Sequence, residues 1–402
     1  MFGFLKKKRK LPVVYTRQEH CVSRANIDED ALKVLYRLHG LGYTAYLVGG
    51  GVRDLLMGRK PKDFDVGTSA LPNEVREAFR NCFLIGRRFR LAHVRFAGGK
   101  IIETATFRQS SQSVGEIIEH AAEGPMEDNT FGTPETDAYR RDFTVNGLFY
   151  NIADFSVIDW VGGMEDIRHK IIRAIGNPGV RFQEDPVRMM RAVKFSSRLG
   201  FKIEPKTWAA MKKYHSCILL AATPRVCEEV FRLFTYSHSA QAFALMWECG
   251  MLGDLVPELA QYIDRTGGRR SPAFKYLKAL DQYDEMMSAK GFEVSNGLRA
   301  AVLMTGLFQE DRRKGGAGRK TVQLLTGAIK APKSVYFTGA ILLDSTRRLA
   351  ESPKKLKTAR FVHSREFLDA LDYNRIVARA DGRSEATLNE WADLYESKHQ
   401  QT

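Results

Sequence analysis

Apolar residues recur at two different spacings over the first 160 positions of the chain. Apolar residues at 34, 35 and 38 follow the one at 31 by three, four and seven positions, which predicts an amphipathic helix over 28–39. A second helix is predicted over 72–82, with Pro72 near its first turn. Short apolar runs predict strands at 45–48, 83–85, 92–96, 100–106, 142–150 and 156–159. This alternation predicts an α/β domain built around a small sheet.

The pattern changes after residue 177, and from Pro186 onward helical spacing dominates. Before that change, residues 109–138 are polar and predict a long loop with a short helix near 114–122. We therefore expect a basic arm over 1–24 and an α/β head over 25–176. Two helical regions should follow, over 177–265 and 266–402.

Charge and cysteine content narrow the class of protein. The 402 residues carry a formal net charge of +15. This charge favours a protein that binds a polyanion such as nucleic acid over one that is basic but has no such partner. The run KKKRK at 6–10 either solvates the terminus or touches RNA phosphates. Five cysteines without paired spacing indicate free thiols in a reducing compartment, and no apolar run has membrane-spanning length. We expect a cytoplasmic monomer with no membrane partner.

The candidate chemistry begins in the stretch LVGGGVRDLLMGRKPKDFDV at 47–66. Gly49, Gly50 and Gly51 follow a strand and precede a helix, where backbone N–H groups can approach a phosphate. Asp63 and Asp65 are two residues apart, so in a strand they face the same side and could hold a divalent cation. Each feature alone also fits an ordinary turn or a solvated pair of acids. Their proximity favours metal-assisted phosphoryl or nucleotidyl transfer.

Glu103, in the strand IIETATFR, is the candidate third carboxylate, since a two-metal site needs more negative charge than two aspartates supply. The alternative is a surface position on a strand. If the three carboxylates crowd together without metal, repulsion should raise the pKa of at least one of them.

Arg141, Asp142 and Asn146 lie in YRRDFTVNGLFYN. Arginine can bind phosphate oxygens in bidentate fashion, while the aspartate could accept from a ribose hydroxyl and the asparagine could add a hydrogen bond. An ordinary charge cluster at the end of a loop is the alternative.

Asp185, Arg188 and Arg191 lie in EDPVRMMRAVKFSSRLGF. Asp185 precedes a proline and would serve well as a helix cap. Arg188 falls three residues later on the same helical face, so the pair could instead offer an acceptor and a donor to a nucleotide base. Arg191 could extend this basic face.

With these residues assembled, the chain resembles the class II branch of the polymerase-beta-type nucleotidyltransferase superfamily, which includes bacterial poly(A) polymerases and CCA-adding enzymes. The resemblance covers residues 45–201. The matching stretches, in order, are LVGGGVRDLLMGRKPKDFDV, the strand with Glu103, YRRDFTVNGLFY, DWVGGMEDI and EDPVRMMRAVKFSSRLGF. It implies an α/β nucleotidyltransferase head, with a small mixed antiparallel sheet and helices, followed by an all-helical neck, body and tail.

The resemblance also implies a role for each matching residue. Asp63 and Asp65 would bind two Mg²⁺ ions, and the backbone of residues 49–51 with Arg53 would lie near the triphosphate of ATP. Arg141 and Asp142 would hold the sugar and phosphates. Asp185 and Arg188 would read the base. The RNA 3′ hydroxyl would attack the α-phosphate and release pyrophosphate.

One stretch bears on the choice of product. LIGRRFRLAHVRF at 84–96 resembles a strand signature of bacterial poly(A) polymerases, with Arg87, Arg88 and Arg90 either contacting RNA or facing solvent. We therefore expect template-independent polyadenylation of RNA 3′ ends, in mRNA, other transcripts or tRNA. The alternative is a CCA-adding tRNA nucleotidyltransferase. A non-catalytic RNA-binding relative is disfavoured because all three carboxylates are present.

Overall fold

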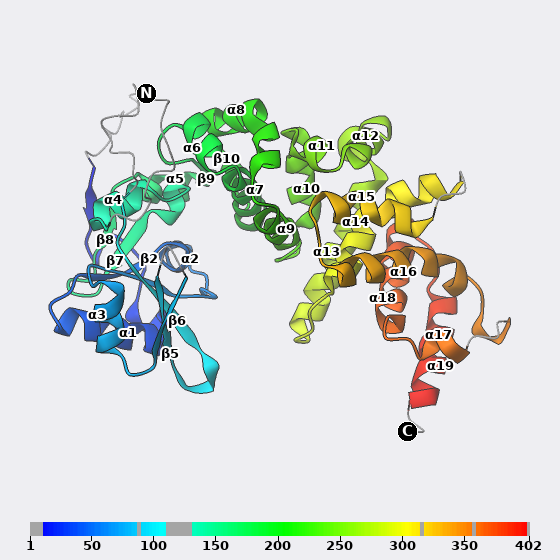
Figure 1. Cartoon of the computed structure of the whole chain (residues 1–402), viewed down its shortest axis with the longest axis horizontal. Coiled ribbons are helices and arrows are strands. Elements are labelled where there is room, and N and C mark those ends of the chain that lie inside the picture. The colour runs from blue at the N-terminus through cyan, green and yellow to red at the C-terminus, as the bar shows by residue number, and fades with distance from the viewer. Residues whose placement is uncertain (1–10, 87–89, 110–130, 314–316, 356–358, 400–402) are drawn as a thin grey trace, which may run out of the picture. The chain divides into compact units, whose positions relative to one another are not determined.

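The computed structural model describes residues 11–86, 90–109, 131–313, 317–355 and 359–399. The chain divides into two compact units, residues 1–181 and 182–402 (Figure 1). The first unit carries the predicted α/β head, and the second carries the predicted helical region. The finer division of the helical region into neck, body and tail remains a prediction.

The first unit is built on an eight-stranded sheet with the strand order β1-β8-β7-β2-β3-β6-β5-β4. Its strands are β1 (Val13–Tyr15), β2 (Ala45–Val48), β3 (Asp65–Thr68), β4 (Cys82–Ile85), β5 (Leu91–Arg95), β6 (Ile101–Thr106), β7 (Leu148–Asn151) and β8 (Val157–Asp159). In the described ladders, β3 and β6 pair in parallel and the other neighbours pair antiparallel. The mixed, mainly antiparallel sheet expected for this fold class is therefore confirmed.

Helices accompany the sheet in this unit. They are α1 (Glu29–Gly40), α2 (Gly50–Leu56), α3 (Pro72–Ala78), α4 (Pro134–Tyr139) and α5 (Gly163–His169), with the two-residue strand β9 (Ile171–Ile172) and helix α6 (Pro178–Glu184) after them. Asp28 caps α1 by accepting hydrogen bonds from the N–H groups of Asp30 and Ala31, which fixes the predicted helix start. Pro72 occupies the first turn of α3, as expected.

The two faces of the sheet carry different clusters because side chains alternate along a strand. On one face Leu47, Val66 and Ile102 pack in a large core with the apolar sides of α1, α2 and α3. On the other face Val48 and Phe107 belong to a smaller aromatic cluster. The smaller cluster lies on the face toward which Asp65 and Glu103 point, one residue out of phase with Val66 and Ile102.

Four local predictions differ from the structure. The helix predicted over 72–82 ends at Ala78, and Cys82 begins strand β4. Part of the expected N-terminal arm, Val13–Tyr15, forms edge strand β1 and pairs with β8, because Val13 and Tyr15 alternate into the core. The predicted strand over 142–150 begins only at Leu148, since Thr144–Asn146 form a 3-10 turn. The predicted loop contains helix α4, capped by Thr133, while the predicted helix over 114–122 lies outside the described residues.

The second unit is a helical array after a two-residue strand, β10 (Lys202–Ile203). Its helices are α7 (Val187–Leu199), α8 (Pro205–Tyr214), α9 (Thr223–Arg232), α10 (Ser239–Glu248), α11 (Met251–Leu255), α12 (Pro257–Arg265), α13 (Pro272–Ala289), α14 (Asn296–Arg313), α15 (Gly318–Ala328), α16 (Lys333–Leu349), α17 (Ala359–Val362), α18 (Phe367–Asp381) and α19 (Ala386–His399). Among the described helices, none is both long and apolar enough to cross a bilayer. All five cysteines are free thiols.

Candidate active site

Asp65 and Glu103 lie beside each other on neighbouring strands. Strand β3 begins at Asp65 and pairs in parallel with β6 in the register Val66 to Thr104. The residues that precede this pair on the two strands are Asp65 and Glu103, so they lie next to each other on the same face of the sheet. Phe64 packs against the core on the opposite face, as the alternation predicted. The predicted third carboxylate thus lies next to Asp65, and its role in a shared site stays a prediction.

The crowding of carboxylates is visible in the electrostatics of Asp65. Burial, followed by the negative charges of Glu103 and Asp63, raises the pKa of Asp65 from 3.8 to about 6. The positive charge of Arg141 acts in the opposite direction and lowers it. The expected repulsion among the carboxylates therefore contributes to this rise in pKa, although burial contributes more. These four side chains, from three separate stretches of the sequence, form one electrostatic group.

The glycine run before α2 makes a turn that ordinary residues cannot follow. Gly49 has φ +71° and ψ −132°, and a Cβ placed there would lie 2.8 Å from Nη1 of Arg141. A Cβ on Gly51 would lie 3.3 Å from the backbone oxygen of Asp63, so the turn packs closely on the aspartate segment. The N–H of Gly49 donates to the carbonyl of Leu148. The N–H groups of Gly50 and Gly51 belong to the first turn of α2, where a helix supplies no acceptor.

Arg141 is held by a carboxylate that the sequence reading missed. Its Nε and Nη2 donate to Oδ2 of Asp137 at 3.1 and 2.9 Å, and its guanidinium lies 5.0 Å from the centre of the Phe149 ring. Asp137 is 2% exposed and also accepts from Arg140. Burial opposes its ionisation, but the charges of Arg141 and Arg140 outweigh burial and lower the pKa of Asp137. The four-residue spacing of Asp137 and Arg141 was the one available sequence signal.

Asn146 links two more of the predicted residues. Its Oδ1 accepts from Nη1 of Arg53 at 2.6 Å, and its Nδ2 donates to Oδ1 of Asp142 at 3.0 Å. Arg53 is 2% exposed and forms a buried ion pair with Asp54 at 2.7 Å. The structure therefore places Arg53 in a buried network beneath the turn, and its implied position near the triphosphate stays a prediction.

The predicted base-reading residues belong to the second unit, where each has a definite partner. Asp185 Oδ2 accepts from Nη2 of Arg225 on α9 at 2.8 Å, and Arg188 donates to Glu184 at 2.9 Å. Asp185 makes no side-chain cap for α7, whose N-cap is Pro186. The capping alternative for Asp185 is therefore not what the structure shows. Arg191 lies over the ring of Phe195, with its guanidinium 5.5 Å from the ring centre.

The predicted RNA-binding arginines precede strand β5. Arg90 is exposed just before β5, while Arg87 and Arg88 lie outside the described residues. Beside them in sequence, His93 pairs with Glu103 across the antiparallel ladder, with its Nε2 3.7 Å from Oε1 of Glu103. Within the described ranges, no three Asp, Glu, His or Cys side chains form a group that could hold a metal ion alone.

Two family descriptions match this chain. Residues 45–173 match the "Poly A polymerase head domain", and residues 200–263 match the "Probable RNA and SrmB- binding site of polymerase A". The first match contains the carboxylates, the glycine turn and Arg141. The second covers α8, α9, α10 and α11 with most of α12.

Characterised proteins and a solved structure resemble the chain over longer stretches. Poly(A) polymerase I of Salmonella typhi is 47% identical over 258 residues, which cover 63% of this chain and 55% of the relative. The CCA-adding enzyme of Lactobacillus helveticus is 38% identical over 232 residues, covering 57% and 55%. The chain thus spans about half the length of these relatives. The crystal structure of Bacillus stearothermophilus CCA-adding enzyme in complex with CTP matches with a TM-score of 0.70 and 27% identity, covering 93% of this chain and 82% of that one.

Proposed function

Because this chain belongs to the class II nucleotidyltransferase family of poly(A) polymerases and CCA-adding enzymes, we propose that it adds AMP from ATP to RNA 3′ ends without a template. The observation that carries this proposal is the placement of Asp65 among Glu103, Asp63 and Arg141. Negative groups for a cation lie there beside a positive group for a phosphate. Nucleotidyl transfer requires both.

The carboxylate group fits Mg²⁺. Burial, together with the negative charges of Glu103 and Asp63, raises the pKa of Asp65 to about 6, and a divalent cation would offset the repulsion among these acids. Asp63 and Asp65 would hold two Mg²⁺ ions. Since Mg²⁺ keeps water and substrate phosphate oxygens among its ligands, it does not need a cage of three protein side chains. When bound, the ions would lower the pKa of the RNA 3′ hydroxyl and neutralise charge on the phosphates.

The other side chains would orient the nucleotide. Arg141 donates to Asp137 and lies against Gly49, and its guanidinium would bind phosphate oxygens as a bidentate donor. Asp142 would accept from the ribose, with its carboxylate oriented by the amide of Asn146. Arg53 supports that amide from below.

Asp185 and Arg188 remain our candidates for reading the base. Oδ1 of Asp185 is buried, and no hydrogen-bond partner for it occurs among the described residues. A buried carboxylate oxygen in that state is unfavourable, and an N–H donor on a base would satisfy it. Arg191 would extend this nucleotide-binding face, and Arg90 would contact RNA phosphates. Transcripts, mRNA among them, would be the substrates.

Adenosine addition is preferred over CCA addition because identity is higher to the poly(A) polymerase, 47% against 38%. The fold similarity to a CCA-adding enzyme keeps that activity as the second candidate.

The experiment supplies purified protein with a tRNA lacking its terminal CCA, or with an unstructured RNA, and either ATP or CTP alone. Long tails from ATP on both RNAs are the expected result. Addition that needs CTP and stops after three nucleotides on the tRNA would assign CCA addition instead. The Asp65→Asn protein is the matched inactive control, and it should still bind RNA.

A further inference from the structure

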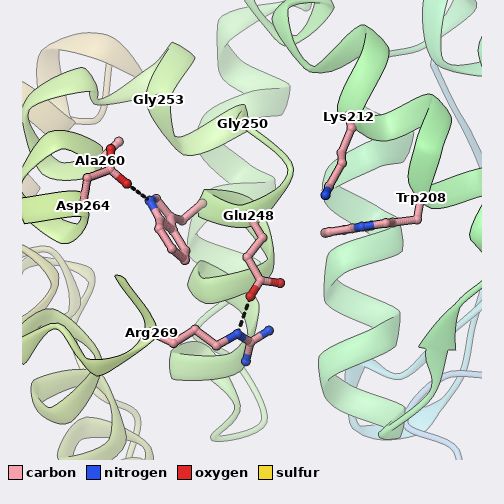
Figure 2. Close-up of a pocket in the computed structure, with 9 residues that line it drawn as sticks. Trp208, Lys212, Glu248, Gly250, Gly253, Ala260, Asp264 and Arg269 are labelled. Carbon is pink, nitrogen blue, oxygen red and sulfur yellow. Dashed lines mark hydrogen bonds and ion pairs between the residues drawn. The ribbon is translucent and has the colours of Figure 1, made fainter. Parts of the chain in front are cut away.

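A cavity of about 660 Å³ lies entirely within the second unit. It is bounded by α8 on one side and by α10, α11, α12 and the turn at Gly268–Arg270 on the other. Its lining residues are Trp208, Lys212, Trp247, Glu248, Gly250, Gly253, Ala260, Asp264 and Arg269. Its volume falls in the range of small-ligand sites. Figure 2 shows Trp208 and Lys212 projecting from one helix toward Glu248 and Arg269.

Two half-buried indoles face this space. Lys212, four residues after Trp208 on α8, holds its ammonium over the Trp208 ring, 5.6 Å from the ring centre. Trp247 is fixed at both ends: its Nε1 donates to Oδ1 of Asp264 at 2.9 Å, and a Cβ on Gly268 would lie 3.0 Å from the far edge of its ring. An indole held in this way is a pre-oriented platform with an accessible π surface.

Two cations, Lys212 and Arg269, and two carboxylates, Glu248 and Asp264, line the cavity, so their formal charges balance. Glu248 is already paired with Arg269, and Asp264 accepts from the indole of Trp247. No carboxylate lies within ion-pair distance of Lys212 in the described part of the chain, and its ammonium is exposed. Aromatic platforms with cations at the rim are the arrangement by which proteins hold single-stranded nucleic acid.

Small residues keep the cavity open. Gly250 and Gly253 carry no side chain, and a Cβ on Gly253 would meet only Cβ of Ala260, at 3.9 Å. Gly253 lies within α11 at a backbone conformation that other residues adopt. A larger residue at 253 would therefore occupy the cavity without forcing a change in the backbone.

From these contacts we infer that the cavity is a subsite for one unpaired nucleotide of the RNA substrate. Its base stacks on the indoles of Trp208 and Trp247, and its backbone phosphate meets the ammonium of Lys212. The inference rests on the proposed action on RNA, and it names a contact made by the RNA away from the carboxylates of the first unit. The stacking contact is tolerant of sequence, because every base has a π face.

Tryptophan fluorescence tests binding directly, without ATP, so that no chemistry occurs. The chain has four tryptophans, of which Trp160 and Trp391 are buried while Trp208 and Trp247 are half-buried. Quenching by iodide should therefore report mainly on the cavity. A short oligoadenylate should protect the fluorescence from iodide in the wild-type protein. Protection should be largely lost in the Gly253→Leu variant, which keeps all four indoles.

Steady-state kinetics give a second readout. Trp208→Ala should raise KM for RNA about 5- to 100-fold, the range expected from the loss of one stacked base, with a much smaller effect on KM for ATP. Trp208→Phe should retain most of the affinity, since it keeps an aromatic face. Lys206→Ala, exposed on the same helix but outside the cavity, is the matched control and should behave as wild type. Equal thermal unfolding of all variants would show that they are folded.

The outcomes separate this subsite from the proposed function. The subsite alone would be overturned if the wild-type protein extends RNA but oligoadenylate does not protect its fluorescence, and if Gly253→Leu and Trp208→Ala leave KM for RNA unchanged. A protein segment would then be the candidate occupant of the cavity. Protection without any AMP incorporation by wild-type protein would overturn the proposed function and support the subsite. Equal loss of RNA affinity in Trp208→Ala and Trp208→Phe would overturn stacking as its basis.

Discussion

Replacing Asp65 by asparagine should stabilise the metal-free protein while abolishing nucleotide incorporation. Burial and the charges of Glu103 and Asp63 raise the pKa of Asp65 from 3.8 to about 6, so the fold favours the protonated form. At about 1.4 kcal/mol for each pH unit, this difference in pKa corresponds to roughly 3 kcal/mol. The side chain is only half-buried, and screening by solvent reduces that figure. We therefore expect a gain of about 1 to 3 kcal/mol.

The dependence on pH follows from proton binding. Near pH ~7.5 the carboxyl of Asp65 is ionised in both the folded and the unfolded chain, so the full electrostatic penalty applies. As pH falls through the folded-state pKa of about 6 toward 3.8, the folded protein takes up the proton first and the penalty shrinks. It should be roughly half as large at pH ~5. The asparagine carries no charge at either pH, so its advantage should be greatest near neutrality.

Differential scanning calorimetry in the presence of a chelator can measure this effect. The Asp65→Asn protein should unfold about 2 to 12 °C above wild type near neutral pH, as expected for a unit of this size. Asp63→Asn is the matched control, and its exposed side chain should give a smaller change. An equal or lower Tm for Asp65→Asn near neutral pH would refute the electrostatic reasoning. Appreciable incorporation of AMP by this variant would refute the proposed role in metal binding.

Three further substitutions test the supports of the fold and the site. Asp137→Asn removes the carboxylate that holds Arg141. Urea unfolding should therefore show a free energy of unfolding lower by about 2 to 4 kcal/mol, and initial rates should show a higher KM for ATP. An unchanged KM for ATP would show that this ion pair does not support nucleotide binding. Gly49→Ala introduces a Cβ at φ +71° and 2.8 Å from Arg141. It should lower the stability by about 1 to 3 kcal/mol, and wild-type stability would show that the turn can relax. Glu229→Gln leaves the buried ammonium of Lys194 without its 2.7 Å partner and should lower the unfolding free energy by about 2 to 4 kcal/mol. Adding Lys194→Met should recover most of that loss, and no recovery would argue against the unpaired charge as its cause.

Strand periodicity predicted the shared face of Asp63 and Asp65, but it did not by itself place Glu103 beside them. Side chains alternate with a period of two, so Asp65 and Glu103 fall on one face once β3 and β6 are neighbours. The same rule placed Phe64 in the core. The limits of the predicted strands 83–85, 92–96 and 100–106 agree with the structure to about one residue.

Contacts between distant segments were not predictable in this way. Arg225 binds Asp185 across 40 positions, and this partner explains why Asp185 does not cap its helix. The burial of Arg53 against Asn146, 93 positions away, had no sequence signal either. Trp208 and Trp247, 39 positions apart, had no sequence signal that would place them around one cavity.

The sequence by itself determined the order of helices and strands, the glycine turn and the face on which the metal-binding candidates lie. Each of these depends on residues close together in the chain, where backbone geometry and side-chain alternation act. Only the tertiary structure decided which carboxylate holds Arg141, what surrounds Asp185 and where two indoles meet a cation. Those contacts join separate helices and loops, and their partners are chosen by packing and burial, which leave no periodic pattern in the sequence.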